Sequence, residues 1–293
     1  MVDTTGEQDL RAEDFESIVK GFALQEFKIK PLLMNQTSNA WIETYYRETA
    51  TELTGGLGSA VKGIPRLAAF PYGEPSWTKV QAYIEKYGME GIVSWEDMLT
   101  DNIDVVARTL LRISRAVAYA VDSQIYAVML VAAAVGGGGS TVTVAAGSEW
   151  NSATVANRDP IANILSAKNY LYTNNFDPDR GEGFILLNPN EYEYLLGNSK
   201  VVNNPSFKTA DVVSNGVVGV VCGLKIIVSN VVTTDTGTIV GIAKECGTWK
   251  SASPLTVHTI EDKGVKYTIR AYEMGVTQIT TPKALVLITN TKA

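Results

Sequence analysis

The chain has 293 residues, a formal net charge of −6, and a composition that is 45% hydrophobic and 19% charged. This profile fits a globular protein with one large domain or two modest ones, and it excludes large-scale disorder. Two cysteines without metal-ligand spacing support neither a disulfide framework nor a zinc site, which favours a reducing compartment. The first 16 residues hold six acids and one arginine, so we expect no export signal.

Charge is unevenly distributed along the chain. Residues 1–150 contain 19 acidic and 12 basic residues, whereas residues 151–293 contain 12 and 13. Neither part is basic, which argues against a nucleic-acid-binding domain. The single histidine, His258, leaves little for acid–base or metal chemistry near neutral pH, and we interpret it as a strand residue.

The first part of the chain predicts an arm followed by a ribbon. Residues 1–36 are interpreted as an acidic, partly helical arm that ends near Pro31. AWIETYYRETATEL from Ala40 and SWTKVQAYIEKYG from Ser76 are rich in β-branched and aromatic residues and predict strands. The segment between them contains five glycines and three prolines and little to build a core. A two-stranded ribbon is marginal in water, so we expect this one to lie on another surface.

A long amphipathic helix is predicted between residues 101 and 134. Asp101 is the expected N-cap, and the glycines at 136–139 are the expected end. Such a helix would be about 50 Å long, more than a compact domain of this size usually contains. The apolar face, at three- and four-residue steps, consists of Ile103, Val106, Leu110, Ile113, Val117, Val121, Ile125 and Val128.

The apolar half of this helix, residues 116–135, is long enough to cross a membrane. However, Asp122, Ser123 and Gln124 lie inside it, and an aspartate near the centre of a span costs about 2.5–3.5 kcal/mol. The surrounding alanines compensate little for this cost. We therefore predict a helix that is partly buried in protein rather than a membrane span.

The rest of the chain mixes helices and strands without a βαβ repeat, which predicts the α+β class. Asp159 and Pro160 open a helix, residues 184–187 form a buried strand, and Asn188 with Pro189 opens a short helix. GVVGVVCGLKIIVSNVV predicts two buried strands separated by glycine. LTVHTIEDKGVKYTIRAYEM predicts a hairpin that turns at its Asp-Lys-Gly sequence, and GVTQITTPKALVLIT adds further strands.

The glycine-rich segments do not form a nucleotide-binding motif. GGLGSAVKG lacks the G-x-G-x-x-G spacing, and Lys62 precedes Gly63 where a phosphate-binding loop needs Gly-Lys-Ser/Thr. The sequence also lacks the serine-hydrolase elbow, the zinc-protease motif and the calcium-loop pattern. We therefore predict a protein that is not an enzyme and that needs no metal or cofactor, with an enzyme that uses the glycine loops as the alternative.

Taken in order, these features resemble the major capsid proteins of tailed bacteriophages, the type named after phage Hong Kong 97. The segment from KVQAYIEKYG to IYAVML looks like the family's second loop strand, turn and spine helix, and GFILLNPNEYEYLL resembles its strand and helix around NP. VKYTIRAYEMGVTQITTPKALVLIT resembles the closing strands, with Arg270, Gly275, Pro282 and Ala284 at matching places. The resemblance spans residues 37–293 and depends on the order and spacing of the motifs.

The resemblance implies the Hong Kong 97-like capsid fold, with an N-terminal arm, an extended β-hairpin loop, a long spine helix, a peripheral domain and an axial domain. The function it implies is self-assembly as pentamers and hexamers into an icosahedral shell around double-stranded DNA, in the virion, after assembly in the host cytoplasm. The implied parts are residues 1–36 for the N-arm, 37–90 for the extended loop with its flanking strands, 91–158 for the peripheral domain with the spine helix, 159–240 for the axial domain and 241–293 for the C-terminal strands of the peripheral domain.

The chief alternative within the same fold is an encapsulin-type compartment that holds an enzyme cargo instead of a genome. The resemblance also implies partners: other copies of the chain, a portal, a separate scaffolding protein, possible decoration proteins and non-specifically contacted DNA, with no membrane. Members that crosslink use a loop lysine, for which Lys62 is a candidate by position alone, and a solvated lysine is the other interpretation.

We expect contacts between subunits at eight residues. Five lie on the loop: Glu48, Glu52, Leu57, Lys62 and Arg66. The other three, Arg108, Arg112 and Arg115, form a stripe on the long helix, where like charges four residues apart repel and call for partners. Those partners are acids of the same subunit, acids of a neighbour such as Glu48 or Glu52, or packaged DNA.

Overall fold

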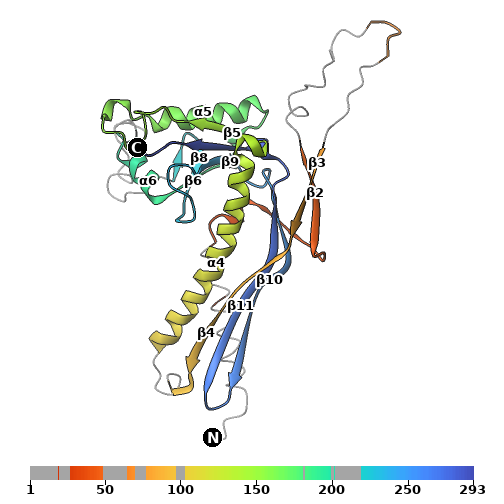
Figure 1. The fold of residues 1–293 in the computed structure, drawn as a ribbon, viewed down its shortest axis with the longest axis vertical. Coiled ribbons are helices and arrows are strands. Elements are labelled where there is room, and N and C mark those ends of the chain that lie inside the picture. The colour runs from red at the N-terminus through yellow and green to blue at the C-terminus, as the bar shows by residue number, and fades with distance from the viewer. Residues whose placement is uncertain are drawn as a thin grey trace.

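A computed structural model shows the fold as three sheets arranged around one long helix (Figure 1). The structure describes residues 19, 27–48, 65–69, 77–96, 103–180, 182–198, 201 and 219–293. Helices and strands are mixed along these ranges, and the predicted α+β class is confirmed.

The long helix α4 spans Ile103–Ala133 and runs diagonally through the molecule (Figure 1). With 31 residues it is about 46 Å long at 1.5 Å per residue. Five residues of the predicted apolar face are almost completely buried: Leu110, Ile113, Val117, Val121 and Ile125. The predicted Val128 is only partly buried, and Met129 takes its place in the buried stripe. The side chains of Ile103 and Val106 lie outside the described residues.

A four-stranded sheet covers the first half of α4. Its order is β1–β10–β11–β4, with bounds Met34–Thr37, Thr248–Asp262, Lys266–Gln278 and Glu85–Ser94. Three of the strands are antiparallel, and β1 joins β10 in parallel. The predicted hairpin is confirmed as β10–β11, and Gly264 in its turn has a φ of +74° that suits glycine.

The side chains between this sheet and α4 form a compact apolar cluster. Val93 of β4 and Ile269 of β11 pack in it with Leu110 and Ile113 of the helix. Gly91 of β4 faces Ile113 so closely that an added Cβ would lie 2.4 Å from its Cδ1 atom. The helix can therefore lie against the strands at this short distance only because position 91 has no side chain.

A six-stranded sheet is formed by strands from residue 140 onward and lies beside the C-terminal end of α4 (Figure 1). Helix α5, Pro160–Thr173, lies along this sheet, and α6 spans Pro189–Leu196. Every residue of β6, Gly183–Leu187, is buried, because β8, Leu224–Val228, and β9, Thr238–Ile242, flank its edges and an apolar cluster covers each of its faces. In spatial order, the strands are β5 Ser140–Thr143, β12 Leu285–Thr289, β9 Thr238–Ile242, β6 Gly183–Leu187, β8 Leu224–Val228 and β7 Val220–Val221.

The predicted starts of α5 and α6 are confirmed by their capping geometry. The Asp159 carboxylate accepts a hydrogen bond of 3.2 Å from the Ala162 backbone N–H, and Pro160 occupies the first turn. Asn188 and Glu191 form a reciprocal capping box at α6. Single-turn 3-10 helices complete the structure at Lys30–Leu32, Val135–Gly137, Val155–Asn157, Pro178–Arg180 and Pro282–Ala284.

The two-stranded ribbon is present as a separate antiparallel sheet of β2, Ile42–Glu48, and β3, Trp77–Tyr83. The sequence predicts one strand from Ser76 onward, and this is wrong in one respect: the segment forms two strands that serve different sheets. β3 pairs with β2, whereas β4 pairs with β11. The division falls at Ile84, which is buried and whose N–H donates to the Trp41 carbonyl at 3.1 Å.

By length and composition alone, residues Arg108–Ala133 of α4 could cross a membrane. Half of its most apolar window is buried inside the protein, against strands of both larger sheets. This is the environment of a core helix, as the position of Asp122 predicts.

Two adjacent glycines after α4 provide a matched test of the close turn that ends it. A Cβ on Gly137 would lie 2.0 Å from the Val131 carbonyl oxygen, whereas a Cβ on Gly136 would meet nothing within 4 Å. We expect Gly137→Ala to lower the free energy of unfolding by about 1–3 kcal/mol, because the backbone must move. Gly136→Ala should change it by less than about 0.5 kcal/mol. Urea unfolding of both variants measures the difference, and equal effects would contradict this account of the turn.

Candidate assembly surfaces

The segment at residues 27–33 is held on α4 by a buried carboxylate. Asp122 Oδ2 accepts hydrogen bonds from the backbone N–H groups of Lys28 and Ile29 at 2.8 and 3.2 Å, and its Oδ1 accepts one from Lys30 at 3.0 Å. Burial raises the pKa of Asp122 above its ordinary value, and the three backbone donors oppose this shift. The aspartate that interrupts the apolar helix is therefore the attachment point of a second segment.

A second buried carboxylate, Glu273 of β11, attaches the same segment to the four-stranded sheet. It pairs with the Lys30 ammonium and accepts a 3.1 Å hydrogen bond from Trp249 Nε1. The Lys30 ammonium also lies 4.5 Å from the centre of the Phe27 ring. Residues 27–37 are thus an integral part of the body, since β1 follows directly and pairs with β10.

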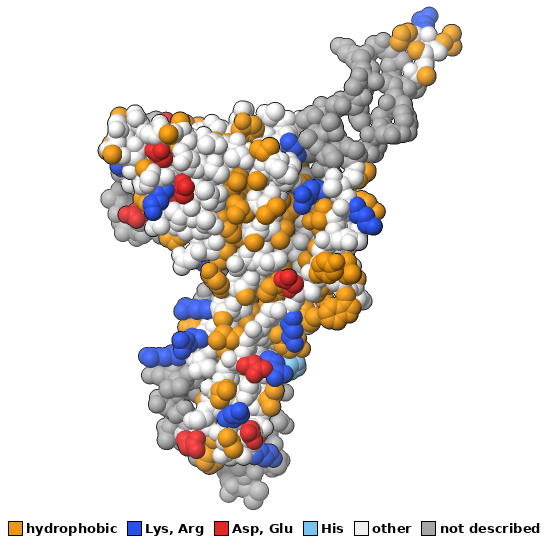
Figure 2. Space-filling model, in the orientation of Figure 1, with side chains coloured by type: hydrophobic (Ala, Val, Ile, Leu, Met, Phe, Trp, Pro, Cys, Tyr) orange, Lys and Arg blue, Asp and Glu red, His pale blue; other side chains and the backbone are white. Residues whose placement is uncertain are grey.

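The hairpin β2–β3 lies beside one end of the four-stranded sheet (Figure 1), where Gln278 Nε2 donates to the Glu43 carboxylate at 3.5 Å. Exposed apolar side chains gather on this side of the molecule (Figure 2). Near the end of β2, Arg47 Nη1 donates to the Gly137 carbonyl at 3.2 Å, just beyond the C-terminal end of α4. Large apolar side chains are exposed on the two strands and at the residue just before β2: Trp41 at 74%, Tyr83 at 64%, Tyr46 at 56%, Trp77 at 52% and Ile42 at 48%. Such a group of side chains on one small element is typical of an interaction surface.

The predicted arginine stripe lies on the exposed side of α4. Arg108, Arg112 and Arg115 are all exposed, and basic side chains gather over the lower part of the helix in Figure 2. Neither Arg108 nor Arg112 pairs with an acidic side chain among the described residues. Arg115 also lines a groove of about 410 Å³ together with Lys28 and Tyr119. The structure thus brings the three arginines together on one surface.

The five loop residues predicted as contacts are less fully described. Arg66 is exposed in the described segment 65–69, between β2 and β3 in the chain. Glu48 is the last residue of β2 and lies opposite Trp77. Glu52, Leu57 and Lys62 lie outside the described residues.

The described residues contain no group of three or more His, Cys, Asp or Glu side chains placed to hold a metal ion. His258 lies on the four-stranded sheet, with its ring centre 5.9 Å from that of Tyr272. Cys246 is completely buried, and desolvation raises the pKa of its thiol to about 12. At neutral pH this thiol is protonated and unreactive.

Comparison with known proteins places the fold among viral capsid proteins. The family model described as phage capsid protein matches residues 77–288. The capsid of cyanophage P-SCSP1u is similar with a TM-score of 0.65 and 14% identity, covering 88% of this chain and 86% of that chain. The mature capsid of bacteriophage PhiM1 gives a TM-score of 0.63 and 14% identity, over 91% and 88%.

A virus-like particle from Pyrococcus furiosus is also similar, with a TM-score of 0.62 and 11% identity, covering 95% of this chain and 99% of that chain. A search of curated protein sequences gave no match. These structures and the family model define the class of the protein as a capsid shell protein with the Hong Kong 97-like fold. The chain belongs to the phage capsid protein family.

The raised pKa of Asp122 predicts a particular dependence of stability on pH. Because the folded-state pKa lies above the ordinary value of 3.8, the folded protein binds this proton more tightly than the unfolded chain. The contribution of Asp122 to the free energy of unfolding should therefore increase as the pH falls through the folded-state pKa, and it should be complete below 3.8. Urea unfolding between pH 7 and 4 measures it against Asp122→Asn.

The expected result is that acidification stabilises the wild-type protein relative to the Asp122→Asn variant, in which this position does not titrate. Taking the difference between the two proteins removes the contribution of the other carboxylates. A gap that stays constant, or that shifts in favour of the variant on acidification, would contradict the dominance of desolvation at this site.

Proposed function

We propose that copies of this chain assemble as pentamers and hexamers into a closed icosahedral shell that encloses double-stranded DNA. The observation that carries the proposal is the exposure of five large apolar side chains on the β2–β3 hairpin and at Trp41 just before it. A two-stranded hairpin is marginally stable alone in water, and burial of apolar area contributes about 25 cal/mol per Å². Contact with a neighbouring subunit supplies the missing cover.

Membership of the phage capsid protein family supports the identity of that cover as another copy of the chain. In a shell every subunit donates one hairpin and receives one, so that contacts of modest strength are repeated around the particle. The cost of ordering an extended segment is then offset by the surface that it covers.

The proposed division into parts follows the chain. We assign residues 1–36 to the N-arm, although 27–36 pack in the body, and 37–90 to the extended loop with its flanking strands. Residues 91–158 and 241–293 form the peripheral domain, and 159–240 form the axial domain around the centre of each capsomer. The six-stranded sheet takes β5 and β12 from outside 159–240, so the two domains share that sheet.

We propose that the arginine stripe of α4 contributes to the contacts between subunits. Arg108 and Arg112 have no acidic partner among the described residues, and acids of a neighbour's loop or arm would complement them. Assembly also requires partners of other kinds: a separate scaffolding protein, a portal and possible decoration proteins. The packaged DNA is contacted without sequence specificity.

An encapsulin-type compartment with an enzyme cargo is the second candidate. The similarity to the Pyrococcus furiosus virus-like particle extends over almost the full length of both chains and is compatible with either candidate. The fold is common to both candidates, so the contents of the particle distinguish them. Absorbance near 260 nm that stays with the particle after nuclease treatment, and that separates from the protein only when the shell is opened before the treatment, indicates packaged nucleic acid. A co-purifying protein with no such absorbance indicates a cargo.

The purified full-length chain, alone or with its scaffold, should form closed shells or rings of five or six subunits. Negative-stain electron microscopy and size-exclusion chromatography measure this directly. A monomer at all protein and salt concentrations, in the presence of candidate scaffolds as well, would contradict the proposal.

The exposed aromatic residues of the hairpin should be required for assembly but not for the fold of the subunit. We expect Trp41→Ser combined with Trp77→Ser to abolish shells, because two large apolar contacts are lost. The melting temperature of the subunit should be nearly unchanged, since both side chains are mostly exposed. Leu165→Ser, an equally polar change at an exposed position of α5, is the matched control. Normal shells from the double variant would overturn this role of the hairpin.

Charge reversal at Arg112 tests the stripe. If Arg112 faces an acid of a neighbour, Arg112→Glu should reduce the yield of shells and make them dissociate at lower salt, because attraction becomes repulsion. Lys292→Glu makes the same change in charge at an exposed position near the C-terminus and should have little effect. Assembly and salt stability that match the wild type would exclude a contact between subunits at this residue.

A further inference from the structure

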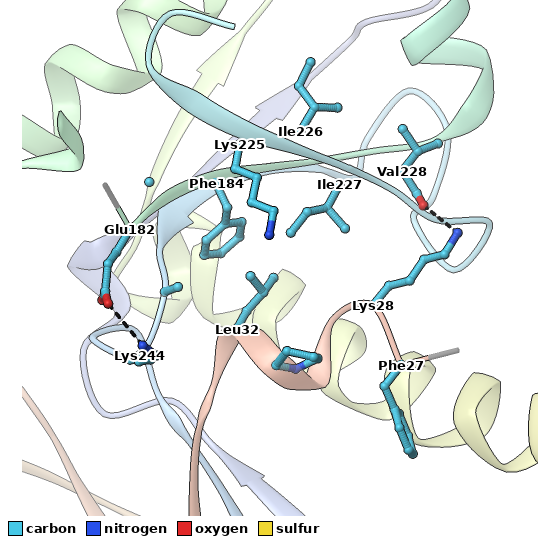
Figure 3. A pocket seen from close by; sticks show the side chains of 13 residues that line it. Phe27, Lys28, Leu32, Glu182, Phe184, Lys225, Ile226, Ile227, Val228 and Lys244 are labelled. Atoms are coloured by element: carbon cyan, nitrogen blue, oxygen red, sulfur yellow. Dashed lines mark hydrogen bonds and ion pairs between the residues drawn. The ribbon is translucent and has the colours of Figure 1, made fainter. Parts of the chain in front are cut away.

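An open cavity of about 560 Å³ lies between the segment at 27–32 and the six-stranded sheet (Figure 3). Its walls come from four places in the chain: residues 27–32, residues 182–184, β8 and the turn at 243–244. The Lys244 backbone N–H donates to the Leu32 carbonyl at 2.7 Å and ties two of these walls together. The attachment of Lys28 and Lys30 to Asp122 also fixes the wall at 27–32 to α4. The cavity is thus built on well-fixed elements.

The floor of the cavity is apolar and its rim is basic. Phe184, Leu32 and Ile227 supply carbon surface, and the first two are almost completely buried. Lys225 reaches from β8 over this floor, between Phe184 and Ile227 (Figure 3). Lys28 and Lys244 stand at the other sides of the opening. Three ammonium groups therefore surround one apolar surface.

The three lysines differ in how well they are paired. The Lys28 ammonium donates to the Val228 carbonyl at 3.0 Å, and Lys244 forms a partly exposed ion pair of 3.1 Å with Glu182. Lys225 has neither a hydrogen bond nor an ion pair with any described residue. With Glu182 as the only acid among the described lining residues, this lining carries a net positive charge and contains one ammonium group ready to receive a carboxylate.

This combination fits a peptide that presents an apolar side chain between carboxylates. A phosphodiester backbone could pair with the ammonium groups, but it would leave the apolar floor unused. A purely apolar peptide would leave the ammonium of Lys225 without a partner. The ligand class is therefore an acidic peptide with an aromatic or aliphatic anchor.

The sequence itself contains such a peptide. Residues 1–18 hold six of the 31 acidic residues of the chain and one of its 25 Lys and Arg residues, which leaves the remainder nearly neutral. Within EQDLRAEDFE at residues 7–16, Leu10 follows an acid and Phe15 stands between Asp14 and Glu16. An apolar side chain flanked by carboxylates matches a floor flanked by ammonium groups.

We propose that the cavity binds the acidic segment 7–16 of a neighbouring copy of the chain. Phe15 or Leu10 occupies the apolar floor, and the adjacent carboxylates pair with Lys225 and its two neighbours. The inference rests on the proposed assembly of many copies, and it adds a second contact to that of the hairpin. The contact joins the leading segment of one subunit to the six-stranded sheet of the next.

The test is the binding of a fluorescently labelled peptide, GEQDLRAEDFES, to the full-length chain, measured by anisotropy at low salt. The chain carries Glu13→Gln, Asp14→Asn and Glu16→Gln, so that its own segment does not compete. We expect saturable binding that Lys225→Glu weakens about five- to tenfold, since an ion pair becomes a repulsion. Lys263→Glu, on the exposed turn between β10 and β11, makes the same change in charge and should leave the affinity unchanged.

A charge-swapped peptide shows whether the contact is direct. In GEQDLRAEKFKS the acids at positions 14 and 16 are replaced by lysine, and this peptide should bind the Lys225→Glu protein more tightly than the wild-type peptide does. Such rescue also shows that the variant is folded. Because the assay needs no shell, it succeeds or fails independently of assembly.

Three outcomes would overturn the proposal. The first is absence of saturable binding to the wild-type cavity. The second is equal affinity for a scrambled peptide of the same composition, which would reduce the effect to net charge. The third is displacement of the peptide by a short DNA duplex with the same dependence on Lys225, which would make the cavity a phosphate site.

Discussion

The whole structure depends on covering one face of α4. A helix of 31 residues presents an apolar stripe that is longer than any one sheet of this protein can bury. The four-stranded sheet covers its first half, and the six-stranded sheet and the segment at 27–33 cover its second half. Two apolar cores are thereby fixed to one rigid rod. The distance between them is set by the rise of the helix rather than by any linker.

Buried carboxylates fasten the segments that this arrangement leaves at its borders. Asp122 holds the backbone at residues 28–30, and Glu273 holds the side chain of Lys30. Glu191 of α6 accepts from the Asn188 and Asp235 backbone N–H groups and from two threonine hydroxyls. The hydrogen bonds and ion pair that these carboxylates form offset the cost of burying them, so each group favours one position for the segment it binds. Their role is to attach elements, and the surfaces are left to carry the function.

Those surfaces are what a shell protein needs. Exposed apolar side chains lie on and next to the β2–β3 hairpin, arginines line the exposed side of the helix, and a basic cavity opens beside the six-stranded sheet. The three surfaces differ in chemistry and would bind different partners. The hairpin would bind apolar area, the arginines would bind carboxylates, and the cavity would bind both. Membership of the phage capsid protein family gives these surfaces a common purpose, because a shell is built from many copies of the same few contacts.

Local sequence patterns predict much of the fold. The stripe of α4, the caps at Asp159 and Asn188 and the glycine turn of the β10–β11 hairpin each depend on residues close together in the chain, and each prediction is confirmed. The order of these elements also indicated the family. The arginine stripe was predicted as a contact surface and is exposed as expected, and its role between subunits stays a prediction.

By itself, the sequence determined which segments become helix, strand or turn, because periodicity, caps and glycines act over a few residues. Only the tertiary structure decided what those segments meet. It divided one predicted strand at Ile84 between two sheets, turned Asp122 from an interruption into an anchor, and brought Lys28, Lys225 and Lys244 around one cavity. The physical reason is that these contacts join residues dozens to hundreds of positions apart, and their free energy depends on burial that exists only after the elements have packed.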